Sequence, residues 1–122
     1  LLQKIRKREK ARDSVLDEIV SIKSNNKISL DDEISGSVGR FGLDVTNPVP
    51  VKGVTGIDNY FEYLSSTCSR KFKWDRQGST SAENIDGMID IYVLTDDNGV
   101  KLPRLYICMY CDATSSKIPE GF

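Results

Sequence analysis

Residues 87–111 carry a regular pattern of hydrophobic and polar positions that predicts a β-hairpin at the centre of the fold. Two runs of β-branched and aromatic residues flank a turn that contains Asn98-Gly99, a dipeptide typical of tight turns between antiparallel strands. Alternation gives the hairpin one apolar face, with Ile89, Ile91, Val93, Leu105, Ile107 and Met109. The opposite face is mixed, with Asp90, Tyr92, Leu94, Arg104, Tyr106, Cys108 and Tyr110. We therefore expect the hairpin to lie inside a sheet, with its apolar face in the core.

Helical spacing of apolar residues occurs in two segments. The first, residues 12–22, predicts an amphipathic helix that docks on the domain through Val15, Leu16, Ile19, Val20 and Ile22. The second is expected to begin at Thr55-Gly56-Ile57-Asp58, which has the spacing of a helix cap, and to end near Ser66. Its apolar positions are Ile57, Tyr60, Phe61 and Leu64.

A shorter helix is expected between Ser29 and Gly36. Ser29 is a favourable N-cap, and Asp31 and Asp32 would lie in the first turn, where the helix dipole favours negative charge. These two acids and Glu33 have a second interpretation as ligands of a cation. No ligand loop surrounds them in the sequence, so capping is the favoured role.

Prolines and charged residues indicate two extended segments. Pro48 and Pro50 hold residues 47–51 extended. Phe72 and Trp74 alternate with charged residues, which predicts a strand whose charged face protects an edge of the sheet, and residues 77–86 are expected to form a polar loop. The elements together predict an α+β fold. It is an antiparallel sheet built around the central hairpin of about residues 87–111, with helices packed on one face and an N-terminal amphipathic helix.

Charge is distributed unevenly along the 122 residues, although the net charge is only −1. Residues 1–12 contain six Lys or Arg and one Glu, and the other 110 residues contain 11 basic and 17 acidic side chains. We therefore divide the chain into a basic N-terminal arm, residues 1–12, continuous with the first helix, and a single α+β domain, residues 13–122. The acidic domain argues against nucleic-acid binding. The basic side chains of the arm are Lys4, Arg6, Lys7, Arg8, Lys10 and Arg12.

The basic arm has three interpretations. It is an exposed helix with solvated charges, the cytoplasmic end of a membrane tether or, least favourably, a nucleic-acid-binding segment. The tether is suggested by Leu1-Leu2 ahead of the basic cluster, a pattern typical of residues that follow a transmembrane helix on the cytoplasmic side. In that case a membrane span would precede Leu1, and the basic side chains would face anionic lipids at the inner face of the membrane.

The candidate chemistry is limited because the chain contains no His and only three Cys. The missing His removes the usual general base and the commonest metal ligand. An odd number of Cys favours a reducing, cytoplasmic compartment. Cys108 and Cys111 have Cys-x-x-Cys spacing, but in a continuous strand they would point to opposite faces about 10 Å apart. We predict that they are neither joined nor bound to metal, and we assign no catalytic residue, metal or cofactor.

A polar binding pocket is predicted on the mixed face of the hairpin and the neighbouring strand. Its residues would be Arg76, Asp90, Tyr92, Arg104, Tyr106 and Tyr110. Converging arginines, a carboxylate and aromatic side chains are typical of sites that orient a polar ligand. The alternative is an exposed ion pair on this face, which would contribute at most about 1 kcal/mol.

Short motifs between residues 47 and 122 resemble a group of small bacterial proteins of uncharacterised function. The motifs are Asn47-Pro48-Val49-Pro50-Val51, Arg76-Gln77-Gly78-Ser79, the hairpin segment Ile89-Asp90-Ile91-Tyr92, and Pro119-Glu120-Gly121-Phe122. The group tends to have a Tyr-His pair where this chain has Tyr110-Cys111. The resemblance implies a bacterial origin and adds no mechanism.

These observations favour a non-enzymatic binding or interaction domain in the cytoplasm, with a protein partner or a small ligand. One form of this hypothesis makes it the cytoplasmic part of a membrane-anchored protein. An alternative is a stand-alone immunity or inhibitor-type protein whose acidic domain covers a basic protein partner. A third is a thiol redox protein that uses Cys108 and Cys111.

Overall fold

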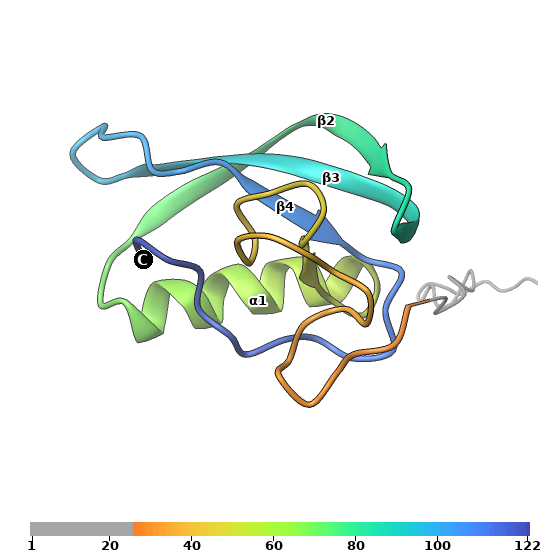
Figure 1. Cartoon of the computed structure of the whole chain (residues 1–122). Helices are drawn as coiled ribbons and strands as arrows, with labels where there is room; N and C mark the ends of the chain where they lie inside the picture. Colours follow the sequence, from red (N-terminus) through yellow and green to blue (C-terminus); the bar gives the residue numbers. More distant parts are fainter. Residues whose placement is uncertain (1–25) are drawn as a thin grey trace, which may run out of the picture.

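One α-helix packs on a four-stranded sheet in residues 26–122, the part of the chain that the computed structural model describes (Figure 1). The sheet order is β1-β4-β3-β2; β1 and β4 are parallel, and the other neighbours are antiparallel. The α+β class and the central hairpin are confirmed, although the sheet is mixed. The basic arm and the first predicted helix lie outside the described residues. The elements are β1 (Val49–Pro50), α1 (Gly53–Thr67), β2 (Phe72–Ala82), β3 (Ile85–Asp96) and β4 (Leu105–Cys108).

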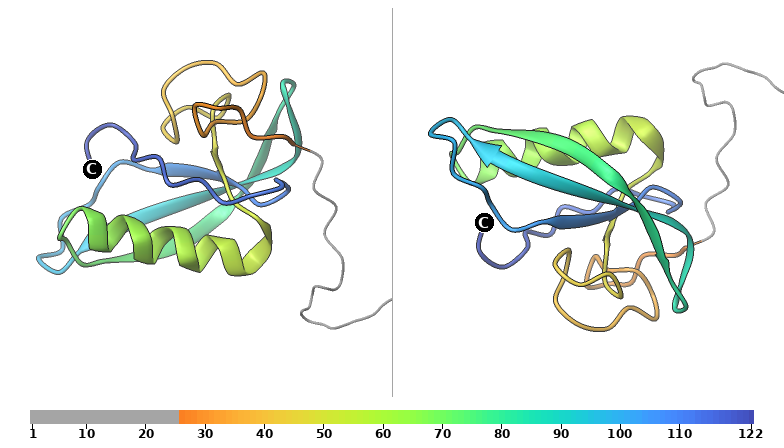
Figure 2. Two further views of the ribbon diagram at one scale, coloured as in Figure 1. Left: turned by 90° about the horizontal axis from the view of Figure 1, so that it is seen from below. Right: turned by 90° about the horizontal axis from the view of Figure 1, so that it is seen from above.

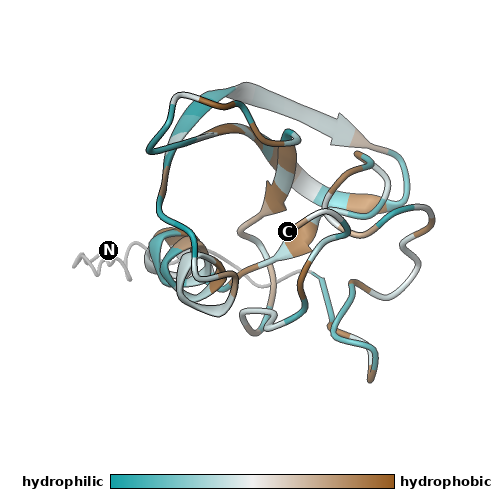
Figure 3. Ribbon diagram, turned by 90° about the vertical axis from the view of Figure 1, so that its left-hand side faces the viewer, coloured by the Kyte–Doolittle hydropathy of each residue, from teal (hydrophilic) through white to brown (hydrophobic). Residues whose placement is uncertain are grey.

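Helix α1 forms where helical spacing predicts it, and it covers one face of the sheet. It starts at Gly53, two residues before the expected cap at Thr55, and buries Ile57, Tyr60, Phe61 and Leu64 against the strands. Figure 3 looks along the axis of α1 and shows the sheet curving around the helix. The main core between them also contains Phe41, Val49, Val51, Phe72, Tyr92, Leu94, Leu105 and Ile107.

The strand register in the central hairpin differs from the predicted one by one position in β3. Asp90 is opposite Ile107 and Tyr92 is opposite Leu105, so these residues of β3 face the helix. Ile91 is opposite Tyr106 on the other face and is half-buried. The prediction that Ile89, Ile91 and Val93 share the main core face with Leu105 and Ile107 is therefore wrong. Alternation could not decide the register, because β3 has apolar residues on both faces and both are partly covered.

A second, smaller core covers the far face of the sheet near the start of β3. It contains Ile34, Ile85, Ile89, Cys108 and Cys111. Both views in Figure 2 show the segment of residues 26–47 on the side of the sheet opposite to α1. Ile34 and the half-buried Val45 come from this segment, and they give Ile89 a buried environment away from the helix.

Two local predictions in this part of the chain are wrong. Residues 77–86 do not form a loop: β2 continues to Ala82, and a two-residue turn leads into β3. The segment has a polar sequence because β2 is an edge strand with many exposed side chains. The short helix after Ser29 is instead a turn closed by the bridge between Ile28 and Ile34. Asp32 has a φ of 66°, which is incompatible with a right-handed helix.

Candidate functional site

The structure divides the six residues of the predicted binding pocket between the two faces of the sheet. Arg76 is opposite Tyr92, and Asp90 lies on the same helix-facing side. Tyr106 lies on the opposite face, because it pairs with Ile91. The remaining two residues are near that second face: Arg104 lines a surface depression with Tyr106, and Tyr110 packs against Gly87. The six residues therefore form two separate groups, with Tyr110 apart from both.

Arg76, Asp90 and Tyr92 form a polar group at the border of the main core. Nε of Arg76 donates a hydrogen bond of 3.2 Å to Oδ1 of Asp90. The side chain of Asp90 is only 10% exposed, whereas that of Arg76 is 53% exposed. Burial, and to a smaller extent the nearby charge of Asp90, raises the pKa of Tyr92. The Tyr92 hydroxyl is therefore neutral at physiological pH and can donate a hydrogen bond.

The Arg104–Tyr106 group borders a shallow depression of about 360 Å³. Its other lining residues are Arg40, Leu43 and Pro103. The Arg40 guanidinium already makes an ion pair of 2.9 Å with Asp44. The depression therefore contains one arginine, Arg104, with no ion-pair partner among the described residues, and it has no buried charged group to fix that arginine.

A second hollow, which we call the α1–β2 groove, lies between the C-terminal half of α1 and the start of β2. Its volume is about 380 Å³. The half-buried Trp74 forms part of its wall and is held in place by Phe61, with ring centroids 5.2 Å apart, and by Phe72 at 6.3 Å. The other lining residues are Glu62, Ser65, Ser66, Lys71, Lys73 and Asp97.

The open edge of β2 borders this groove. Strand β2 is the last strand of the sheet and pairs only with β3. Among the described residues, no backbone hydrogen bond joins the other edge of β2 to a further segment. Figure 1 shows β2 at the margin of the sheet, with its first half rising from the end of α1. Main-chain donors and acceptors therefore lie beside an aromatic groove.

Sequence reasoning identified β2 as an edge strand but did not find the α1–β2 groove. The alternation of Phe72 and Trp74 with lysines was visible in the sequence. The groove also needs Glu62 and Ser65 on the helix side that faces the edge strand, and only the docking angle of α1 places them there.

Cys108 and Cys111 are not joined in a disulfide, as predicted, but the predicted reason is wrong. The strand ends at Cys108, the chain bends, and both thiols lie fully buried in the second core. The Cys111 thiol donates to the Cys108 carbonyl at 3.4 Å and also contacts the Cys108 sulfur. This contact lowers the pKa of the Cys108 thiol and raises that of Cys111.

Thiol titration should report this arrangement directly. In the native protein without reductant, we expect the half-buried Cys68 to react quickly with a thiol reagent and Cys108 and Cys111 to react slowly, because both are fully buried. After unfolding, all three thiols should react. Fewer than three reactive thiols in the unfolded chain would contradict the absence of a disulfide.

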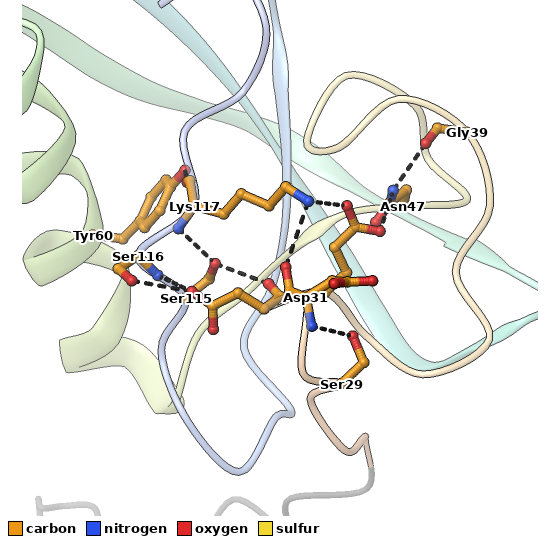
Figure 4. A network of polar contacts seen from close by, with 10 residues as sticks. Ser29, Asp31, Gly39, Asn47, Tyr60, Ser115, Ser116 and Lys117 are labelled. Atoms are coloured by element: carbon orange, nitrogen blue, oxygen red, sulfur yellow. Dashed lines mark hydrogen bonds and ion pairs between the residues drawn. The ribbon is translucent and has the colours of Figure 1, made fainter.

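The acidic residues after Ser29 hold the C-terminal segment in place (Figure 4). Asp32 accepts hydrogen bonds from the backbone N–H of Ser116 at 2.7 Å and from its hydroxyl at 3.1 Å. Glu33 pairs with Lys117 at 2.6 Å, which lowers the pKa of the Glu33 carboxyl. These contacts account for Asp32 and Glu33 without a bound cation, and no cluster of metal-ligating side chains occurs in residues 26–122.

Two further findings bear on function. Within the described residues, no helix is both long enough and apolar enough to cross a membrane. Comparison of the chain with protein-family models, with curated proteins and with solved structures finds no match. The resemblance of residues 47–122 to a group of small bacterial proteins therefore stays a prediction.

Proposed function

We propose that this chain is a non-enzymatic interaction domain that binds an extended segment of a protein partner along the open edge of β2. The observation that carries the proposal is the open edge itself, which lies beside the α1–β2 groove. In β-strand addition, main-chain hydrogen bonds provide affinity and pockets for alternate side chains provide specificity. Strand β2 supplies the main-chain hydrogen-bonding groups, and the α1–β2 groove supplies a pocket for a side chain.

Trp74 is the expected anchor point of the groove. Tryptophan is enriched among interface residues whose truncation costs more than about 2 kcal/mol of binding energy. Here the ring is held by two aromatic neighbours and is still partly exposed, so a partner side chain would meet a preorganised surface. The volume of about 380 Å³ falls within the range of about 300–1,000 Å³ found for ligand pockets and suits one large apolar side chain.

Charged residues on β2 would make this binding selective. Lys71, Lys73 and Asp75 are exposed at or next to the edge strand, and a β-bulge interrupts its pairing between Arg76 and Gly78. Such features protect edge strands from indiscriminate pairing. A partner segment must therefore match these charges as well as supply an apolar anchor.

The cytoplasmic and membrane-proximal placement is a separate proposal. It is supported by the basic residues 1–12 and by the Leu1-Leu2 pair, which lie outside the described part of the chain. Anionic lipids attract such segments by about 1 kcal/mol for each basic residue near the surface. A domain placed there would meet membrane-associated protein partners.

Peptide selection tests the proposed function. Peptides selected from a random library against the full chain should bind wild-type protein, and Trp74→Ala should weaken their binding by about 30-fold, which corresponds to about 2 kcal/mol. Tyr106→Ala is the matched control, because Tyr106 is a half-buried aromatic residue on the opposite face. N-methylation of alternate peptide amides should also abolish binding, because it removes main-chain donors without changing the protein. Equal binding to both variants and insensitivity to N-methylation would contradict the proposal.

A further inference from the structure

We infer that Arg76 recognises a carboxylate of the segment bound along β2, with the buried Asp90 as its positioning residue. This inference rests on the proposed function and adds the chemistry of the partner. It explains why Asp90, an acidic residue, occupies a helix-facing position of β3 next to the main core.

Asp90 has the burial of a core residue, and its carboxylate has one hydrogen-bonding partner among the described residues, Arg76. Asp96 provides a contrast, because its carboxylate accepts backbone hydrogen bonds from Asn98 and Val100 and thereby holds the turn after β3. In the described residues, no backbone N–H donates to the carboxylate of Asp90. Burial of a carboxylate is unfavourable unless it is paired. The hydrogen bond between the Asp90 carboxylate and Nε of Arg76 meets this requirement and fixes the position of Arg76.

Arg76 retains most of its hydrogen-bonding capacity. Only its Nε contacts Asp90, and its two terminal amino groups have no partner in the part of the chain that the structure describes. The side chain is 53% exposed. An arginine fixed through Nε presents its terminal N–H groups in a planar array that matches the geometry of a carboxylate. Arg76 is therefore held in place through its Nε, and its terminal amino groups are open to a ligand.

Arg76 is also placed correctly relative to the α1–β2 groove. It follows Trp74 by two residues, so both side chains lie on the same face of β2, about 7 Å apart. Residues two apart in a bound strand have the same separation. If the apolar anchor of a bound segment lies at Trp74, the side chain two positions along that segment would lie next to Arg76. The predicted recognition pattern is an apolar residue and an acidic residue separated by one residue.

Charge around the groove bears on the orientation of a bound acid. The basic residues Lys71, Lys73 and Arg76 lie on or next to β2, together with the acidic Asp75, whereas Glu62 lies on the α1 side of the groove and Asp97 lines it after β3. The acidic residue Asp58 is also on α1, and its charge acts on Tyr92. The acid of a bound segment would therefore turn toward β2 and away from the helix.

A double-mutant cycle between protein and peptide tests the inference. Library-selected peptides with the predicted pattern are synthesised with Glu or with Gln at the acidic position, each with a free and with an amidated C-terminus. Against the full chain, Glu→Gln in the peptide should weaken binding about tenfold or more, as expected for a charge-assisted hydrogen bond. Against Arg76→Gln, the two peptides should bind equally. Arg104→Gln is the matched control and should keep the full discrimination, because Arg104 is an exposed arginine on the other face.

The outcomes separate this inference from the proposed function. If the peptides contact β2 but bind equally well with Glu or Gln, the carboxylate inference is wrong and the interaction domain stands. If only amidation of the C-terminus weakens binding, the recognised group is the terminal carboxylate, and the predicted side-chain pattern is wrong. If no selected peptide contacts β2, both proposals fail. If Arg76→Gln does not fold, the comparison of Glu and Gln peptides on wild-type protein still shows whether a side-chain carboxylate is recognised.

Discussion

Replacing Ile107 with alanine is expected to lower the free energy of unfolding by about 2–5 kcal/mol, the range for truncation of a fully buried aliphatic side chain. Ile107 is 1% exposed and belongs to the main core between β4 and α1. Ile91 lies on the opposite face and is half-buried, so Ile91→Ala should cost only about 1 kcal/mol, a typical value for a point substitution. Urea denaturation of the two variants and the wild type measures both values.

This pair of variants tests the strand register of the central hairpin. The alternation of apolar residues alone assigns Ile91 and Ile107 to the same buried face and predicts equal losses. The observed pairing of Ile91 with Tyr106 predicts unequal losses. Equal losses of several kcal/mol in the free energy of unfolding would contradict the observed register and support the one that alternation predicts.

Gly42→Ala is the second substitution with a large expected effect, about 2–5 kcal/mol. Gly42 has a φ of +74°, where an L-residue costs about 1–2 kcal/mol. A Cβ atom there would lie 3.0 Å from Cγ2 of Val49 and 3.2 Å from Cγ of Pro119, and overpacking of a core adds about 1–3 kcal/mol. The residue also accepts a backbone hydrogen bond from Tyr106, so it fixes the covering segment to β4.

Gly99→Ala is the matched control for this substitution. Gly99 has a similar φ of +80°, but no heavy atom lies within 4 Å of the position that its Cβ atom would take, so only the backbone cost of about 1–2 kcal/mol applies. Thermal and urea unfolding of the two variants should therefore differ clearly. Equal destabilisation would mean that close packing around Gly42 contributes nothing to stability.

The elements with strong local patterns could be predicted from the sequence. Helix α1 was identified from the spacing of Ile57, Tyr60, Phe61 and Leu64, because one side of a surface helix must be apolar to dock. The extended segment that contains β1 was identified from its prolines, and the central hairpin from its turn and its β-branched residues. In each case the signal is local and needs no knowledge of distant neighbours.

The misassigned features depend on distant contacts. Residues 77–82 are polar because they form an edge strand, and a polar strand resembles a loop in sequence. The segment after Ser29 contains good capping residues, but Asp32 binds Ser116, which lies far along the chain. The second core brings Ile34 onto Ile89 and so makes both faces of β3 apolar. None of these partners is visible within a short window of sequence.

The candidate site was predicted only in part. The sequence identified Arg76, Asp90 and Tyr92 as a polar group on one face, and the structure brings these three together. It also grouped Arg104 and Tyr106 with them, because the assumed register was off by one. The α1–β2 groove was missed altogether, since it depends on how a helix and an edge strand meet in space.

Amide hydrogen exchange of the isotope-labelled full chain, with and without a selected peptide, tests most directly whether β2 receives a partner strand. Strand addition should slow exchange of the outward-facing amides of β2. Nuclear Overhauser spectra of the same sample should show cross-strand contacts between the peptide and residues around Trp74 and Arg76. Amides of β4 should exchange at unchanged rates, because β4 is inside the sheet. Unchanged exchange along β2 in the presence of a bound peptide, or protection confined to the face around Tyr106, would contradict the proposed binding site.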